Sequence, residues 1–186
     1  MIQINVNKMI ENISYLSVGQ VIKALIRLLA FSYVTRSLSI DQYGQVLTVI
    51  AFCELFQIFT LPGINKNLER AACRDLKKID QILSAKSGFR NFAAIIAIGL
   101  VNIIITFLNY DEIVVNLIRF YSIVLLIDSL KDYTRIVFKA FEDFKWISFS
   151  EIFQSVTYLI FVLISIRYKF GIEGIIASSI FSTILG

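Results

Sequence analysis

Apolar residues in this chain gather into long blocks separated by polar segments, without the alternation of apolar and polar positions that strands show. Phe92–Leu108 and Ile152–Ile166, for example, contain no charged residue. A helix that crosses a bilayer needs about 17–25 predominantly apolar residues, whereas a membrane barrel alternates in segments of about ten. The pattern therefore predicts an all-α protein made of transmembrane helices.

Six blocks can be delimited from their flanking polar residues. The predicted spans are Leu16–Ser37, Tyr43–Ile64, Phe89–Leu108, Ile113–Leu130, Ile147–Ile166 and Gly171 onward. We expect residues 1–186 to form a single transmembrane domain, a polytopic helix bundle. Because Gly186 falls inside an apolar run, the sequence also predicts that the chain is the front part of a longer protein, truncated in its sixth span.

Lysine and arginine are distributed unequally between the two sets of loops. Roughly twelve basic residues lie before the first span, between spans two and three and around the end of span four, against three on the other side. Cytoplasmic loops carry this excess in membrane proteins. The sequence therefore predicts a cytoplasmic N-terminus. Within the long basic loop, Ala72, Leu76, Ile79 and Leu83 recur at helical spacing and predict an amphipathic helix on the inner membrane face.

Composition supports the membrane class. Hydrophobic residues make up 57% and charged residues 17% of the chain, whereas soluble domains average about 45–50% and about 25%. The mean hydropathy is +0.75. A net charge of +4 would suit a nucleic-acid-binding protein, but the basic residues lie between apolar blocks, so we expect no nucleic-acid partner.

The residue types that most often carry metal or acid–base chemistry are scarce. The chain has no histidine, and its two cysteines, Cys53 and Cys73, have no metal-ligand spacing. No nucleophile–base pair and no glycine-rich phosphate loop is present. We therefore expect no metal, no cofactor and no enzymatic activity.

Ionisable residues inside the predicted spans are candidates for function, because charge in hydrocarbon is costly and usually faces a bundle interior or a watery cavity. Lys23 and Arg27 lie one helical turn apart in span one, on a polar stripe with Gln20. Arg119 lies close enough to the end of span four to reach water by snorkelling. Asp128 lies with Lys131, Asp132 and Arg135 at the inner end of span four, where local pairing is expected.

Glu54 in span two allows two readings. It can pair with Arg27 or Lys23 as a structural ion pair, or it can couple transport to a proton or an ion. Span five opens with a second polar stripe, Glu151, Gln154 and Tyr158, which would suit the wall of an aqueous cavity or hydrogen bonds between helices.

The segment Arg36-Ser-Leu-Ser-Ile-Asp-Gln-Tyr-Gly44 resembles the loop after the first helix of bacterial polysaccharide flippases, commonly R-x-L-G-x-x-x-Y-G. These proteins belong to the multidrug/oligosaccharidyl-lipid/polysaccharide exporter superfamily. Ser39 replaces the usual glycine and Ile40 a frequent proline. The resemblance is specific over Gly19–Arg74 and extends in layout over the whole chain.

The resemblance implies the N-terminal half of an alternating-access flippase in the bacterial inner membrane. Its substrate would be an undecaprenyl-pyrophosphate-linked oligosaccharide, such as an O-antigen repeat unit of lipopolysaccharide, and its partners membrane lipid and the polysaccharide polymerase machinery. Lys23 and Arg27 match positions that line the cationic cavity of such flippases.

Two other classes remain open at this point. A drug or ion antiporter of the same superfamily would use Glu54 or Asp128 for the coupling ion. A membrane scaffold that transports nothing would use all the embedded charges as structural pairs.

Overall fold

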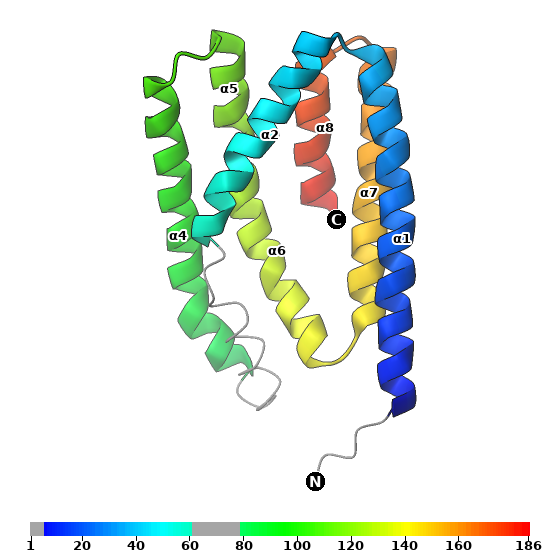
Figure 1. Cartoon of the computed structure of the whole chain (residues 1–186). Helices are drawn as coiled ribbons and strands as arrows, with labels where there is room; N and C mark the ends of the chain where they lie inside the picture. The colour runs from blue at the N-terminus through cyan, green and yellow to red at the C-terminus, as the bar shows by residue number, and fades with distance from the viewer. Residues whose placement is uncertain (1–5, 61–78) are drawn as a thin grey trace.

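The computed structural model describes the backbone of residues 6–60 and 79–186, and the side chains of residues 10–58, 88 and 91–186. Every regular element in these ranges is an α-helix (Figure 1). The helices are α1 (Val6–Ser37), α2 (Ile40–Thr60), α4 (Ile79–Phe107), α5 (Glu112–Tyr121), α6 (Ile123–Ala140), α7 (Phe144–Arg167) and α8 (Gly171–Leu185). The predicted all-α class is confirmed.

Several helices have the length and hydropathy of membrane spans. Among the described residues, Ile10–Ser37, Glu112–Ala140 and Phe144–Arg167 are long and apolar enough to cross a bilayer, and Asn91–Phe107 and Gly171–Leu185 are shorter apolar helices. Span four consists of α5 and α6 together, separated only by Ser122, whose backbone dihedrals stay helical. The chain is a helical membrane protein.

The helices extend beyond the predicted spans. Helix α1 begins at Val6 rather than Leu16, α4 begins at Ile79 rather than Phe89, and α6 continues to Ala140 rather than ending at Leu130. Hydropathy marks only the lipid-embedded part of a helix, whereas the backbone hydrogen-bond pattern continues through polar turns at its ends. The 32 residues of α1 span about 48 Å at 1.5 Å per residue, which exceeds the hydrocarbon thickness of about 30 Å.

Some predictions fall outside the described residues. They are the end of span two at Ile64, Cys73 and most of the predicted amphipathic helix between spans two and three. Ile79 and Leu83, the last two apolar positions of that pattern, fall within α4.

A capping box starts α2. The Ser39 hydroxyl oxygen accepts a hydrogen bond from the Gln42 amide at 3.2 Å, and the Ser39 amide donates to Gln42 Oε1 at 3.1 Å. This reciprocal pair satisfies two donors that the first turn of a helix leaves unpaired. The serine that replaces the usual glycine of the loop motif therefore separates α1 from α2 by stabilising the start of α2.

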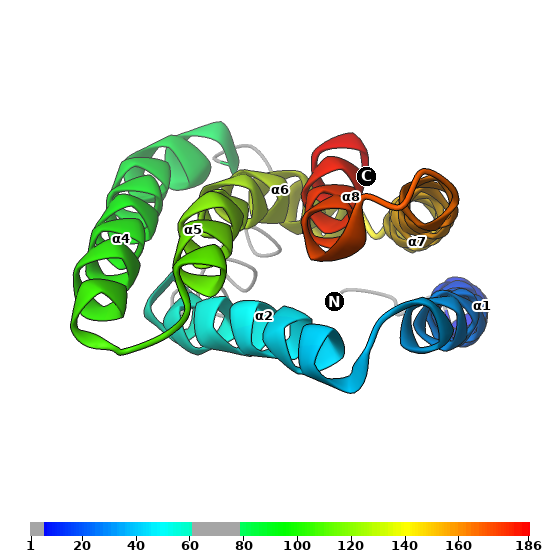
Figure 2. The same ribbon diagram turned by 90° about the horizontal axis from the view of Figure 1, so that it is seen from above.

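The helices run in both directions along the bundle. Helices α1, α4 and α7 run one way, and α2, α5, α6 and α8 run the other way (Figure 1). Seen from above, α1 and α7 lie at one end and α4 at the other, with α2 across from α6 and α8 (Figure 2). The apolar core includes Val49 of α2, Val101 and Ile105 of α4, Ile118 of α5 and Ile176 of α8, all fully or nearly fully buried.

Helix α1 packs closely along α7, but contacts α2 little. Gly19 makes the close approach to α7 possible, because a Cβ atom there would lie 2.8 Å from Ser148 Cβ. Ser148 Oγ also donates a hydrogen bond to the Tyr15 carbonyl oxygen at 3.0 Å. Small residues allow helices to approach in this way when lipid supplies no hydrophobic drive between them. Helix α1 is therefore held in the bundle mainly by α7.

We expect Gly19→Leu to destabilise the bundle by about 1–3 kcal/mol, the usual cost of overpacking. The measurement is the midpoint of thermal unfolding of the purified protein in detergent. Gly99→Leu in α4 is the matched control, because a Cβ at Gly99 meets nothing within 4 Å. An unchanged midpoint for Gly19→Leu would show that the α1–α7 contact is not as tight as described.

The turns lie at opposite ends of the bundle, which allows a test of the predicted orientation. The α4–α5 turn at Asn109 and the α6–α7 turn at Glu142 are both exposed and lie at opposite ends (Figure 1). In a background lacking Cys53 and Cys73, a cysteine at Asn109 should react with a membrane-impermeant thiol reagent in intact cells. One at Glu142 should react only after permeabilisation. The reverse pattern would place the N-terminus outside.

Candidate functional site

A cavity of about 510 Å³ lies between α1, α2, α6, α7 and α8, with Tyr121 of α5 on its wall. Most of the candidates from the sequence line it. They are Lys23, Arg27, Glu54, Asp128, Gln154 and Tyr158. Further polar or charged lining residues are Gln57, Lys131, Asp132, Arg135, Ser155, Ser179, Ser182 and Thr183. One cavity thus collects polar side chains that are up to about 160 positions apart in the sequence.

Helix α1 presents a single face to this cavity. Lys23, Arg27, Phe31 and Val34 line it, at spacings of four, four and three residues that keep side chains on one side of a helix. The opposite face of α1 is apolar and exposed, with Leu25 and Leu29 more than half accessible. In a membrane protein, an apolar exposed face suits lipid and a charged face suits the interior. The polar stripe predicted for span one therefore points into the bundle.

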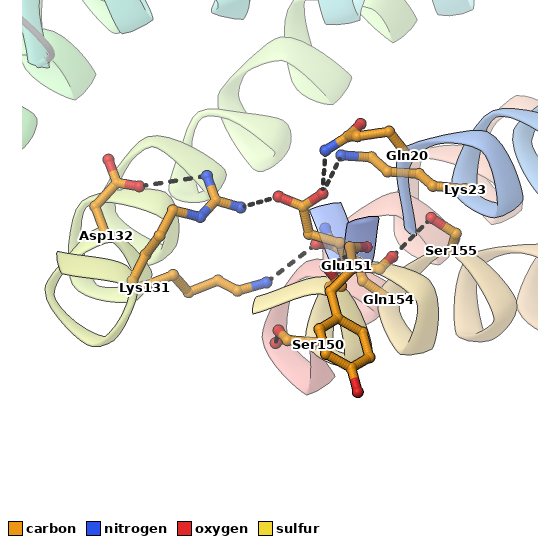
Figure 3. A network of polar contacts seen from close by, with 12 residues as sticks. Gln20, Lys23, Lys131, Asp132, Ser150, Glu151, Gln154 and Ser155 are labelled. Atoms are coloured by element: carbon orange, nitrogen blue, oxygen red, sulfur yellow. Dashed lines mark hydrogen bonds and ion pairs between the residues drawn. The ribbon is translucent and has the colours of Figure 1, made fainter. Parts of the chain in front are cut away.

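Glu151 is the centre of a polar network at the end of the cavity near the α6–α7 turn (Figure 3). Its Oε2 atom accepts hydrogen bonds from Gln20 Nε2 at 2.7 Å and from Lys23 Nζ at 3.1 Å, both on α1. Its Oε1 atom accepts from Arg135 Nη2 on α6 at 2.8 Å. The Glu151 side chain is only 12% exposed. One carboxylate of α7 therefore joins α1 to α6.

A second set of hydrogen bonds lies next to this network, one helical turn along α7. Lys131 Nζ on α6 donates to Gln154 Oε1 at 3.3 Å and to the Thr183 carbonyl oxygen at 2.9 Å. Gln154 Nε2 donates in turn to Thr183 Oγ1 at 3.3 Å. These contacts connect α6, α7 and α8 around the ammonium group of Lys131.

The expected local pairing at the end of span four holds only in part. Arg135 lies 3.8 Å from Asp132 on its own helix, but its shorter contact is with Glu151 across the bundle. Lys131 likewise reaches α7 and α8. The physical reason is that α6 continues to Ala140, so these side chains project from a helix beside the cavity instead of clustering in a loop.

Arg27 and Glu54 differ from the other charged residues of the cavity. The structure pairs Lys23 with Glu151 rather than with Glu54. Among the ion pairs formed by residues 10–58 and 91–186, none includes Arg27 or Glu54. Asp128 accepts a hydrogen bond from Gln57 Nε2 at 3.1 Å. Arg27 therefore presents a guanidinium group to the cavity with no ionic partner among the described side chains.

The two ends of the cavity differ in polarity. Phe31, Val34, Tyr43, Val46 and Leu47 line it toward the α1–α2 turn, whereas the charged residues of α6 line it toward the α6–α7 turn. On α1, Arg27 lies between Phe31 and Lys23, and Lys23 belongs to the charged end through its bond to Glu151. A ligand with a charged group and a less polar part would fit such a gradient.

Other predicted residues lie apart from the cavity or act differently. Gln20 and Glu151 are network members beside the cavity rather than lining residues. Arg119 is exposed near the end of α5 and does not line the cavity. Sequence reasoning missed Ser179, Ser182 and Thr183 of α8. Their spacing of three and four residues on one helical face was the available signal.

The comparisons with known proteins identify the family of the chain. A family model described as "Polysaccharide biosynthesis protein" matches residues 9–186. No curated protein and no solved structure matches the chain. The family match covers the apolar helices and every residue that lines the cavity. The chain therefore belongs to the polysaccharide biosynthesis protein family.

Proposed function

We propose that this protein is a flippase that moves lipid-linked oligosaccharide repeat units, of O-antigen or a related surface polysaccharide, across the bacterial inner membrane. It acts by alternating access and performs no covalent chemistry. The substrate is an oligosaccharide attached to undecaprenyl pyrophosphate. The bundle described above supplies one wall of the transport pathway, and the polysaccharide polymerase machinery receives the product.

The observation that carries this proposal is the position of Arg27. Its guanidinium group lines the cavity and has no ion-pair partner among the described residues. Arg27 lies ten residues before the end of α1 at Ser37, which corresponds to about 15 Å along the helix axis. A charge at this depth is costly unless water or an anion meets it. A transported anion is the partner that this position supports.

The charge of the substrate explains why arginine is suitable. A pyrophosphate that crosses about 30 Å of hydrocarbon needs compensating positive charge. Arginine binds phosphate oxygens through two parallel N–H donors, whereas lysine acts as a point charge. Arg27 is therefore the principal pyrophosphate contact in our proposal, and Lys23, one turn away, is the second.

Hydroxyl and amide groups suit the sugar part of the substrate. Ser179, Ser182 and Thr183 of α8 line the cavity with Gln154 and Tyr158 of α7. Tyr121 Oη and Ser179 Oγ lie 3.4 Å apart. Such groups donate and accept hydrogen bonds without a net charge, which a neutral oligosaccharide requires.

A drug or ion antiporter is the second candidate, and Glu54 favours it. Glu54 lines the cavity without an ion pair among the described residues, as a residue that binds a coupling proton would. Arg27 and Lys23 on the same wall disfavour a cationic drug. A scaffold without transport is the third candidate, and it predicts that removing Arg27 leaves export intact.

We expect Arg27→Ala to weaken binding of undecaprenyl pyrophosphate to the purified protein by about 10- to 100-fold, the loss typical of a charge-assisted hydrogen bond. It should also abolish surface polysaccharide in cells while protein abundance stays near normal. Arg27→Lys should keep part of both activities because the charge remains. Undecaprenol, which lacks phosphate, is the probe that should show no dependence on Arg27.

Arg36→Ala is the matched control for this experiment. Arg36 is exposed on the same helix and does not line the cavity. It is nine residues from Arg27, which places it half a turn around the helix. Its removal should leave binding and export near wild type. Equal losses for Arg27→Ala and Arg36→Ala would contradict a specific contact.

Alanine variants of Arg27 and Glu54 test the alternative that Arg27 serves only as a structural partner of Glu54. If Arg27 serves only to balance Glu54, each single alanine variant should lower protein abundance, and the double variant should recover it. In our proposal the double variant remains inactive because the pyrophosphate contact is still missing. Recovery of export in the double variant would reject the role of Arg27 in substrate binding.

A further inference from the structure

The carboxylate of Glu151 occupies a position that suits a phosphate group. Its two oxygen atoms are held separately, one by Lys23 and Gln20 of α1 and the other by Arg135 of α6. Lysine, arginine and amide donors that converge from different helices are the usual ligands of phosphate. Lys23 and Arg135 also line the cavity, so a ligand inside it can reach both cations.

The burial of the network makes this arrangement energetically important. The side chains of Glu151 and Lys23 are 12% and 20% exposed, whereas that of Arg135 is 44% exposed. Charge-assisted hydrogen bonds between partly buried groups are stronger than those in water. A ligand anion that takes over these two hydrogen bonds must therefore displace the carboxylate that already accepts them.

We propose that Lys23 and Arg135 form a second anion site, which Glu151 occupies in the empty protein and which a pyrophosphate group takes over in exchange. This inference rests on the proposed function for its ligand, because lipid-linked pyrophosphate is the anion that the cavity would receive. The site itself follows from the geometry of the network. Glu151 thus lowers the affinity for the substrate and keeps the two cations balanced when no substrate is present.

Three of the four basic side chains that line the cavity have hydrogen-bond acceptors in the empty protein. Arg135 and Lys23 are balanced by Glu151, and Lys131 donates to Gln154 and to a carbonyl oxygen. Arg27 has no carboxylate partner among the described residues, so an entering pyrophosphate can bind it without displacing another anion. Lys23 is one turn from Arg27 on the same face of α1, so a pyrophosphate on Arg27 lies next to the cation that Glu151 holds.

Glu151→Gln and Arg135→Gln separate this proposal from a structural role. Both variants break the same ion pair, but only Glu151→Gln removes the competing charge. We expect Glu151→Gln to bind undecaprenyl pyrophosphate about tenfold more tightly than the wild type, and Arg135→Gln to bind it about tenfold more weakly. A structural tie between helices would shift the affinity in the same direction in both variants, and this result would overturn the proposal.

Asp132→Asn controls for the general effect of removing a negative charge. Asp132 lies 3.8 Å from Arg135 on the same helix. We expect a rise in affinity of less than about threefold, because neither Lys23 nor Arg135 loses its bond to Glu151. An increase in affinity equal to that of Glu151→Gln would indicate that removing any nearby negative charge strengthens binding. This result would reject the proposal that the ligand displaces the Glu151 carboxylate.

Inorganic pyrophosphate, measured beside the lipid probe, separates this inference from the proposed function. If Glu151→Gln tightens binding of both probes, the anion site stands whatever the effect of Arg27→Ala on export. If only the lipid probe responds, the site takes a lipid headgroup. If neither affinity rises in Glu151→Gln while Arg27→Ala still abolishes export, the anion site is rejected and the flippase proposal remains.

Discussion

A charged side chain in the interior of a membrane protein needs water or an opposite charge, and this requirement organises the described bundle around its cavity. Each charged residue at the centre of a membrane helix costs about 2.5–3.5 kcal/mol on insertion scales. Four basic side chains line the cavity, namely Lys23, Arg27, Lys131 and Arg135. Their combined cost would rival the whole stability of a typical domain, about 5–15 kcal/mol. Facing a polar cavity reduces this cost for all four side chains, and the contact with Glu151 reduces it further for Lys23 and Arg135.

Close helix packing creates the space that these charges require. Gly19 and Ser148 bring α1 against α7, and Ser165 contacts α8 near Gly174, where a Cβ atom would lie 2.9 Å from Ser165 Cβ. Small residues therefore hold α1, α7 and α8 together. The longer polar side chains of α1 and α7 meet beside the cavity, where Gln20 and Lys23 bind Glu151.

The sequence was sufficient to predict the helical membrane class, because unbroken apolar runs have few alternative structures in lipid. It also indicated Lys23 and Arg27 as one stripe, since residues four apart share a face in any helix. It could not predict that Glu151, rather than Glu54, pairs with Lys23. That contact depends on α1 packing along α7, which is a tertiary choice that no local pattern encodes.

The sequence was also insufficient to predict where the helices end, and α6 is the clearest case. Hydropathy placed the end of span four at Leu130, and the charged residues that follow were expected to pair locally. The helix continues to Ala140 and carries Lys131 and Arg135 to the cavity. A polar helical turn and a loop have similar composition, so hydropathy alone does not separate them. The S-x-x-Q pattern of Ser39 and Gln42 is a local capping pattern whose role became clear only with the hydrogen bonds at the start of α2.

The central claim is that the polar face of α1 borders a wet cavity, and its most direct test is the reactivity of single cysteines toward a water-soluble thiol reagent in native membranes. In a background without Cys53 and Cys73, a cysteine replacing Arg27 should react, because that position is exposed and lines the cavity. A cysteine replacing Leu29 should stay unreactive, because that exposed apolar position faces lipid. Reaction at Leu29 together with protection at Arg27 would contradict the account.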